Sequence, residues 1–272
     1  MMLLATSGSL AYDDTGSGPL VVCLPGMGDN RTTYRHLVPL LVAAGRRVVT
    51  VDPRGQGESD AVWPGYSPEA IGADLLELLR HLDAGPALLV TNSYTGATAV
   101  WAAAQEPTAF SGLVLIAPFA RVMPKPNPVL RLAVAAVSRF RPLWITYWSG
   151  LFKTRRPDDF AAARAVLSRQ LAEPGRMAAL RAMMRADVAV SEARFPEVRT
   201  PALVVMGTRD PDFPAPRDEA TLIARRLRGR VVMIDGAGHY PHAEYPAETA
   251  AAILASSTGS GPVPGEVTTI AE

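Results

Sequence analysis

Residues 87–104 read ALLVTNSYTGATAVWAAA, and this stretch decides the fold. The apolar run 87–90 is typical of a buried strand, and an Ala-rich helical pattern from Tyr94 to Ala104 follows almost at once. A strand that turns so sharply into a helix exposes the residue on the turn at the helix N-terminus, where developing negative charge is favoured. Ser93 occupies that turn and is a candidate nucleophile.

The residues around Ser93 also allow a plainer interpretation. Such an elbow needs small residues two positions before and two after the nucleophile, and this chain has Thr91 and Thr95 there instead of glycines. A serine that only caps the following helix would give a similar local string. Both interpretations stay open on these residues alone.

Outside this stretch, short apolar runs alternate with amphipathic segments. The runs expected to be strands are Leu20–Leu24, Arg47–Val51, Ala87–Val90, Leu113–Ile116, Ala202–Met206 and Arg230–Ile234. The segments expected to be helices are Tyr34–Ala44, Pro68–Leu82, Tyr94–Ala104, Asp218–Leu227 and Pro246–Ala255. Strands that are apolar along their whole length are covered by helices on both faces, so the pattern predicts an α/β fold with a mostly parallel, doubly wound sheet.

One interval breaks the alternation. Residues 119–200 contain no convincing strand but four helical patterns, Val129–Phe140, Leu143–Phe152, Asp158–Leu171 and Gly175–Val188. We therefore expect a core formed by residues 1–118 and 201–256, and a helical cap (lid) formed by 119–200 between two strands. The small, polar and Pro/Gly-rich residues 257–272 predict a disordered tail.

Composition excludes several classes of protein. A formal net charge of +1 gives no basis for nucleic-acid binding, and Cys23 is the only cysteine, so neither an intramolecular disulfide nor a cysteine-based zinc site can form. The N-terminal residues lack the basic region and the long apolar run of a signal peptide or membrane span. We expect a cytoplasmic protein without a membrane or nucleic-acid partner, as a monomer or homodimer.

Further residues of the candidate site follow other predicted strands. Residues 20–28, LVVCLPGMG, are a strand and a tight turn, and the backbone N–H groups of Met27 and Tyr94 are the natural donors for an oxyanion hole. His239 follows the glycines of 235–239, DGAGH, and is favoured over the neighbouring His242 as general base. Asp210, just past the strand at 202–206, is favoured over Asp212 as the acid that orients the imidazole.

Together these motifs resemble the α/β-hydrolase superfamily, over roughly residues 9–255. The string DPRGQGES at 52–59 is similar to the family's D-x-R-G-x-G-x-S turn, in which Asp52 and Arg54 have structural roles, and Gly238-His239 with Glu244 and Pro246 is similar to its terminal segment. The chain order serine, aspartate, histidine is the one expected of this fold. Asn92-Ser93 and the four-helix cap also show some similarity to carbon–carbon bond hydrolases and to esterases.

The resemblance implies a serine hydrolase of the carboxylesterase or thioesterase type, with Ser93, Asp210 and His239 as catalytic triad and no metal or organic cofactor. It would cleave an ester, thioester or related carbonyl substrate through an acyl-enzyme on Ser93. The alternatives are a carbon–carbon bond hydrolase, an acyl transferase or cyclase in small-molecule metabolism, and, in another class, a non-catalytic ligand-binding protein of the same fold.

Two properties of the cap bear on the substrate, which we expect to be a small acyl compound. An aromatic stripe includes Trp144, Tyr147 and Trp148; packing of cap on core is its first explanation, and contact with substrate its second. Residues 119–200 also hold fifteen Lys and Arg against six Asp and Glu. Most of this charge would lie on solvated helix faces, and the alternative is that it steers an anionic or carrier-linked substrate.

Overall fold

The structure is a computed structural model that describes residues 1–5, 8–124, 127–257 and 267–271. Within these residues nine strands form one sheet in the order β1-β2-β4-β3-β5-β6-β7-β8-β9. The strands are β1 (Met2–Ala5), β2 (Gly8–Thr15), β3 (Leu20–Leu24), β4 (Arg47–Val51), β5 (Ala87–Asn92), β6 (Phe110–Ile116), β7 (Ala202–Gly207), β8 (Arg230–Ile234) and β9 (Val267–Ile270). The pairs β1–β2 and β2–β4 are antiparallel, and all other neighbours are parallel.

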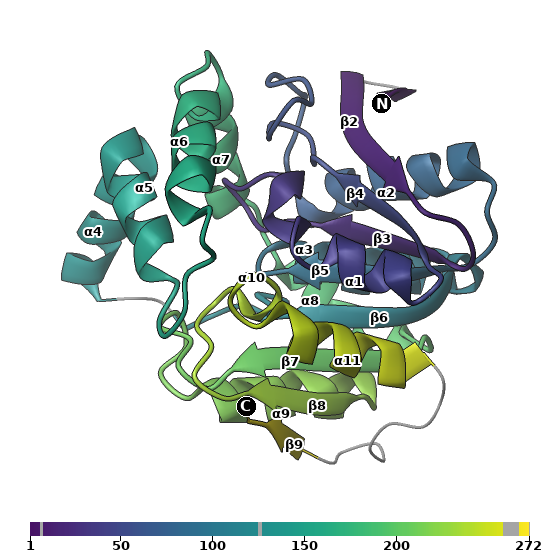
Figure 1. Cartoon of the computed structure of the whole chain (residues 1–272). Coiled ribbons are helices and arrows are strands. Elements are labelled where there is room, and N and C mark those ends of the chain that lie inside the picture. Colours follow the sequence, from purple (N-terminus) through teal and green to yellow (C-terminus); the bar gives the residue numbers. More distant parts are fainter. Residues whose placement is uncertain (6–7, 125–126, 258–266, 272) are drawn as a thin grey trace.

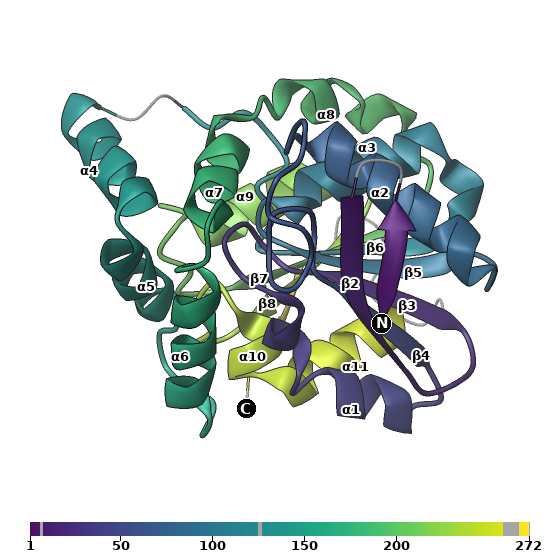
Figure 2. The same cartoon turned by 90° about the horizontal axis from the view of Figure 1, so that it is seen from above.

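Helices cover both faces of the sheet (Figures 1 and 2). On one face lie α1 (Val38–Ala43) and α11 (Pro246–Ser257), and on the other α2 (Pro68–Leu82), α3 (Thr95–Gln105) and α9 (Pro216–Leu227). The central strands β3 and β5 are buried at every residue, as expected for strands covered on both sides. The prediction of a doubly wound, mostly parallel α/β fold is confirmed.

Parallel register brings the carboxyl ends of the central strands together. Leu24 at the end of β3 pairs with Thr91 of β5, and Asn92 at the end of β5 pairs with Ile116 at the end of β6. On the other side, Ile116 pairs with Val205 near the end of β7, and Gly207 pairs with Ile234 at the end of β8. The loops that follow these strands therefore meet at one edge of the sheet, where ligands bind in open α/β folds.

All six predicted strands are present, but three further strands, β1, β2 and β9, were not predicted. β2 mixes polar with apolar residues and so lacks the continuous apolar run of the central strands, whereas β1 is apolar but only four residues long. Both pair in antiparallel fashion on one side of the sheet. The prediction of a disordered tail is wrong for Val267–Ile270, because these four β-branched residues pair with β8 as a parallel edge strand. The other residues predicted for the tail beyond Ser257, namely 258–266 and 272, lie outside the described residues, and Ala271 follows β9 without regular structure.

Between β6 and β7 the described residues form helices and no strand. These are α4 (Pro128–Arg139), α5 (Arg141–Gly150), α6 (Phe160–Gln170), α7 (Arg176–Arg185) and α8 (Ala189–Ala193). Helices α4 to α7 form a separate layer beside the carboxyl ends of the strands (Figure 1), which is the position expected of a cap. In contrast, α8 packs against α3 of the core. None of the helices described is long and apolar enough to span a bilayer.

Candidate active site

Ser93 lies on a strained turn between β5 and α3. Its φ is +59°, in the left-handed region that residues with a Cβ rarely adopt. Backbone hydrogen bonds fix the turn: Ser93 N–H donates to the carbonyl of Ile116 at 2.9 Å, and the Ser93 carbonyl accepts from Gly96 and Phe119, both at 3.0 Å. Strain held in this way at the end of a central strand is typical of a nucleophile elbow.

Thr91 and Thr95, which replace the elbow glycines, fit inside the protein. Both are fully buried. The Thr95 hydroxyl donates to the carbonyl of Leu24 at 3.1 Å and to that of Asn92 at 2.9 Å, while the Thr91 hydroxyl approaches the carbonyl of Val114 at 3.5 Å. Thr95 thus links the end of β3 to the elbow, a hydrogen bond that a glycine could not make.

The turn after β3 lies against Ser93. A Cβ placed on Gly26 would come within 2.9 Å of the Ser93 Cβ, so the backbone there approaches the elbow as closely as a glycine permits. Met27 follows directly, and Gly28 has a φ of +66°. This proximity is what an oxyanion hole would require of Met27, because its N–H must face the oxygen of the carbonyl group whose carbon the serine attacks.

The loop that carries His239 is fixed to the elbow and to the cap. The Asn92 side-chain amide donates to the His239 carbonyl at 3.2 Å, and the His239 N–H donates to the Leu151 carbonyl at 3.0 Å. The Glu244 carboxylate accepts the Gly238 N–H at 2.7 Å with one oxygen and the Lys153 N–H at 2.9 Å with the other. These bonds place His239 beside Asn92, the residue directly before Ser93.

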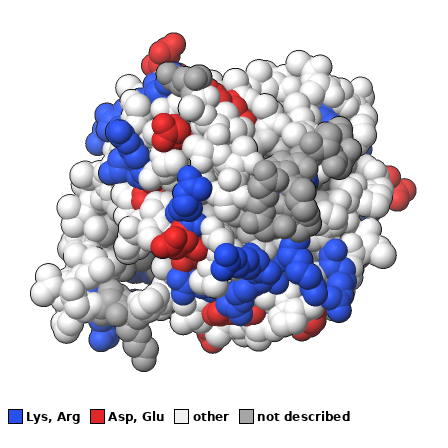
Figure 3. Space-filling view, turned by 90° about the horizontal axis from the view of Figure 1, so that it is seen from below, with Lys and Arg blue, Asp and Glu red and all other residues white. Residues whose placement is uncertain are grey.

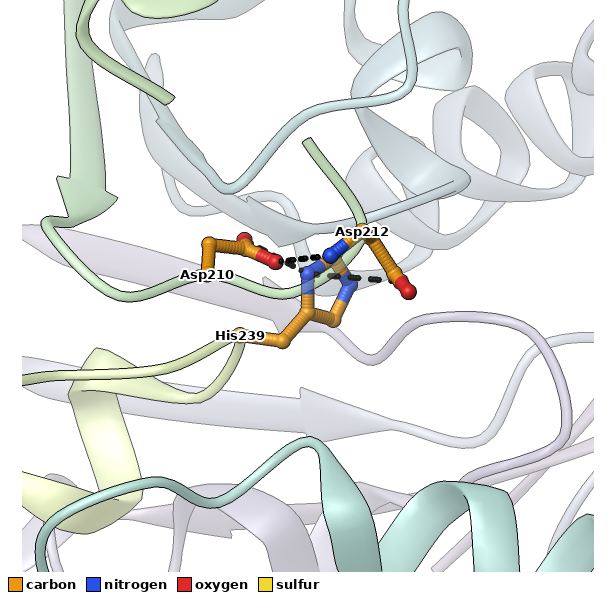
Figure 4. A group of neighbouring side chains, drawn as sticks. All are labelled: Asp210, Asp212 and His239. Carbon is orange, nitrogen blue, oxygen red and sulfur yellow. Dashed lines mark hydrogen bonds and ion pairs between the residues drawn. The ribbon is translucent and has the colours of Figure 1, made fainter. Parts of the chain in front are cut away.

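His239 forms a short contact with Asp210 (Figure 4). The distance from His239 Nδ1 to Asp210 Oδ2 is 2.8 Å, and both side chains are almost completely buried. The other Asp210 oxygen accepts the Asp212 N–H at 3.0 Å. This is the geometry by which a buried carboxylate fixes the tautomer of an imidazole and stabilises imidazolium.

A second carboxylate lies near the same nitrogen. Asp212 Oδ2 is 3.7 Å from His239 Nδ1, and both oxygens of Asp212 accept from the Tyr147 hydroxyl, at 2.9 and 2.7 Å. Burial alone would lower the pKa of His239, but the charges of Asp210 and Asp212 outweigh it and raise that pKa to about 9. Of the two aspartates, Asp210 is the direct partner of the imidazole.

His242, the alternative base, has different surroundings. It lies in α10 (Pro241–Glu244), is fully buried, and its Nε2 lies 3.2 Å from the Thr33 hydroxyl. Burial lowers its pKa to about 3, and the charges of His239 and Arg35 act in the same direction. Its ring lies 4.7 Å from that of Tyr34, so it packs within the core rather than beside an acid.

Two of the aromatic residues expected at the substrate pocket form hydrogen bonds between the cap and the core. Trp144 Nε1 donates to the Gly28 carbonyl at 3.1 Å, and Trp148 Nε1 donates to Asp29 Oδ2 at 3.2 Å. Both indoles are buried. They therefore hold α5 against the loop that carries Met27. Contact of Trp144, Tyr147 or Trp148 with substrate stays a prediction.

Part of the positive charge of residues 119–200 is used within the fold. Arg176 is buried and donates to the Ser59 carbonyl, and Arg121 pairs with Glu219 at 2.5 Å. Basic side chains also gather across the face that carries α9, β8 and β9, outside this interval (Figure 3). Positive charge is therefore not confined to the cap.

Asp210, Asp212 and His239 form the one cluster of the described residues whose ligand atoms lie close enough to surround a metal ion. The hydrogen bonds already named use these same atoms: Nδ1 faces Asp210, and Tyr147 occupies both oxygens of Asp212. The donor set thus fits a hydrogen-bonded acid–base pair better than a metal site.

Sequence reasoning missed the residues that hold the site together. Asn92 was noted only as the neighbour of Ser93, yet its amide joins the elbow to the His239 loop across 147 positions. Tyr147 was predicted to pack the cap on the core or to contact substrate, and the bond from its hydroxyl to Asp212 was not predicted. The only sequence signal for this contact was the hydroxyl group of Tyr147, a polar group on an otherwise apolar helical stripe.

Comparisons with known proteins identify the family of the chain. The model of the alpha/beta hydrolase family matches residues 21–252. A polyketide synthase, ThaQ, of Burkholderia thailandensis is 31% identical over 242 residues, which are 82% of this chain and 11% of that protein. The chain covers less than half of the length of several other curated relatives that it matches.

Two further proteins are similar over nearly their whole length. The 2-(acetamidomethylene)succinate hydrolase of Mesorhizobium japonicum is 28% identical over 90% of both chains. The crystal structure of a thermophilic esterase from Thermogutta terrifontis superposes with a TM-score of 0.78 at 25% identity, covering 96% of this chain and 99% of that one. The match over residues 21–252 and the shared fold show that the chain belongs to the alpha/beta hydrolase family.

Proposed function

We propose that the chain is a serine hydrolase that cleaves an ester or thioester through an acyl-enzyme on Ser93. The observation that carries the proposal is the buried His239–Asp210 pair, held by Asn92 directly beside the strained serine elbow. Relatives named hydrolase and esterase support the same chemistry. The order of the three residues along the chain is that of the fold's catalytic triads.

In the proposed cycle, His239 takes the proton of the Ser93 hydroxyl as its oxygen attacks the substrate carbonyl. Asp210 stabilises the imidazolium that results, and the N–H groups of Met27 and Tyr94 donate to the oxyanion. The imidazolium then protonates the leaving group. Water, deprotonated by His239, releases the acid and restores Ser93.

A small cavity where the cap meets the loop after β3 lies apart from the proposed catalytic residues. Leu167, Leu171 and Leu180 border it together with the polar Asp29, Gln56 and Gln170, whereas Ser93, Asp210 and His239 do not. The cavity therefore does not define the acyl group of the substrate. Arg176 also borders this cavity, although its guanidinium is bound to the backbone at Ser59.

The test is a set of p-nitrophenyl esters and acyl-thioesters of graded chain length, assayed with Ser93→Ala. We expect the variant to lose at least about a thousandfold in kcat. Ser256→Ala is the matched control, because this hydroxyl donates to Ile253 within α11. Hydrolysis at the wild-type rate by Ser93→Ala would contradict the proposal.

Acyl transfer is the second candidate, favoured by the 31% identity with a polyketide synthase. The same acyl-enzyme would then pass its acyl group to an alcohol or amine in place of water. Product analysis with a thioester and an added acceptor separates the two: free acid indicates hydrolysis, and acylated acceptor indicates transfer.

A further inference from the structure

Two carboxylates occupy one side of the proposed base, but the proposed cycle uses only one of them. Asp210 contacts His239 Nδ1 at 2.8 Å, and Asp212 lies 3.7 Å from the same atom. The Asp212 side chain is largely buried, with 12% of it exposed. A second buried acid this close to the first carries a cost, because burial and the neighbouring negative charge both favour its neutral form.

Tyr147 offsets that cost from the cap. Its hydroxyl reaches across from α5 and donates to both oxygens of Asp212, at 2.9 and 2.7 Å. Burial is the largest influence and, with the charge of Asp210, leaves the pKa of Asp212 above its ordinary value, whereas the imidazolium of His239 and the hydrogen bond from Tyr147 lower that pKa. A donor aimed at both oxygens favours the ionised form of a buried carboxylate.

Other charged groups face this cluster from the elements packed around it. Lys153, in the segment after α5, acts on Asp212 and favours its ionised form. Glu244 of α10 raises the pKa of His239, and His242 of the same helix is buried nearby. Among the described residues, Tyr147 is the side chain that donates a hydrogen bond to the Asp212 carboxylate.

We propose that Tyr147 is a positioning residue, which holds Asp212 ionised beside His239 so that a second negative charge stabilises the imidazolium while the cap is seated. This inference rests on the proposed function. The same helix places Trp144 and Trp148 on the oxyanion loop through the Gly28 carbonyl and the Asp29 carboxylate. Seating of α5 would therefore organise both the base and the loop that binds the oxyanion.

The experiment compares Tyr147→Phe, Asp212→Asn and the double variant. The probe is a fluorophosphonate, and the measured quantity is its second-order rate constant of inactivation between pH 5 and 10, because this reaction needs neutral His239 but no known substrate. Asp212→Asn removes a carboxylate beside the imidazole, and Tyr147→Phe removes the hydrogen bond that keeps this carboxylate ionised. For each single variant we expect the acidic limb of the rate–pH profile to move to lower pH by about one unit, with a slower plateau rate.

The double variant separates positioning from packing. If Tyr147 acts through Asp212, adding Tyr147→Phe to Asp212→Asn leaves the acidic limb where Asp212→Asn alone put it. Phenylalanine keeps the ring that packs 5.3 Å from Trp144, so a purely structural role would slow the reaction without moving the limb. Tyr12→Phe is the control, since its hydroxyl lies 3.4 Å from His81 and outside the site.

The inference would be overturned if Tyr147→Phe left the acidic limb of the rate–pH profile unmoved. It would also be overturned if Tyr147→Phe moved this limb as far in the Asp212→Asn background as in the wild type. Thermal unfolding of each variant checks that it is folded. Should Asp212→Asn fail to fold, Asp212→Ser gives the same comparison with a smaller neutral side chain. Labelling of Ser93→Ala, run beside these variants, separates the two proposals, because undiminished labelling there would contradict the serine mechanism itself.

Discussion

Two buried histidines only three positions apart have opposite electrostatic properties. His239 faces two carboxylates and has a pKa raised to about 9, whereas His242 faces a threonine hydroxyl and a tyrosine ring and has a pKa lowered to about 3. Both rings are almost inaccessible to water. Burial by itself lowers the pKa of each, so the difference comes from their charged neighbours.

The comparison teaches which of the two can act as a base assisted by an acid. A general base of a serine hydrolase must bind a proton during the reaction and have the resulting charge stabilised. Asp210 is placed to provide this stabilisation at His239, the proposed base. At His242 the surroundings favour the neutral ring, which suits a structural side chain of α10.

Exchange of each histidine for glutamine should give the largest difference in activity between the two positions. His239→Gln removes the base, and we expect a loss of about a thousandfold or more in kcat/KM for an activated ester. His242→Gln should cost far less than this, because no reacting atom depends on it. Steady-state kinetics of the two variants provides the measurement, and equal losses would contradict the assignment.

The acids provide the next largest effect. Asp210→Asn leaves the shape of the site but removes the charge that orients and stabilises the imidazole, so kcat should fall by roughly a thousandfold. Asp235→Asn is the matched control, because Asp235 also follows a strand but accepts a hydrogen bond from Thr208. Comparable kcat values for Asp210→Asn and the wild type would rule out Asp210 as the orienting acid.

The raised pKa of His239 has a direct kinetic consequence. The base must be neutral to accept the serine proton, so kcat/KM should increase about tenfold for each pH unit and level off near pH 9. A profile of kcat/KM against pH from 6 to 10 with a neutral ester measures this. A plateau already reached at pH 6.5 would mean that the carboxylates do not hold the proton on the imidazole.

His242 should affect stability rather than catalysis. Its folded pKa, about 3, lies below the ordinary value of 6.5, so the unfolded chain binds a proton that the folded chain does not, and stability falls as the pH decreases from 6.5 toward 3. The loss attributable to this residue is about 1 kcal/mol for each pH unit. Urea unfolding of His242→Gln and wild type at pH 4.5 and 7 measures it. An identical pH dependence in both proteins would contradict the assignment.

The central sheet could be predicted from sequence because its signal is local. The run at Leu20–Leu24 and its counterparts are short and continuously apolar, which only strands covered on both faces require. The strands β2 and β9 lacked that signal, since each mixes polar with apolar residues and pairs with a neighbour distant in sequence. Val267–Ile270 in particular follows a run with the composition of a tail.

The sequence predicted the residues of the candidate site that follow strand ends and glycine turns, but not the contacts between them. Ser93, Asp210 and His239 each follow a strand, so their convergence was expected from parallel topology. The sequence could not distinguish 2.8 Å from 3.7 Å for two aspartates separated by one residue. Nor could it pair Tyr147 with Asp212, because that contact depends on how the cap packs on the core.

The central claim is that an imidazole–carboxylate pair activates the serine on the strained turn. Peptide mapping by mass spectrometry after treatment with a fluorophosphonate, at pH 10 where His239 with a pKa of about 9 is largely neutral, provides the test of this claim. We predict a single adduct on Ser93 in the wild type, and labelling slowed at least about a hundredfold in His239→Gln. An adduct on another residue, or equal labelling of Ser93 in both proteins, would contradict the account.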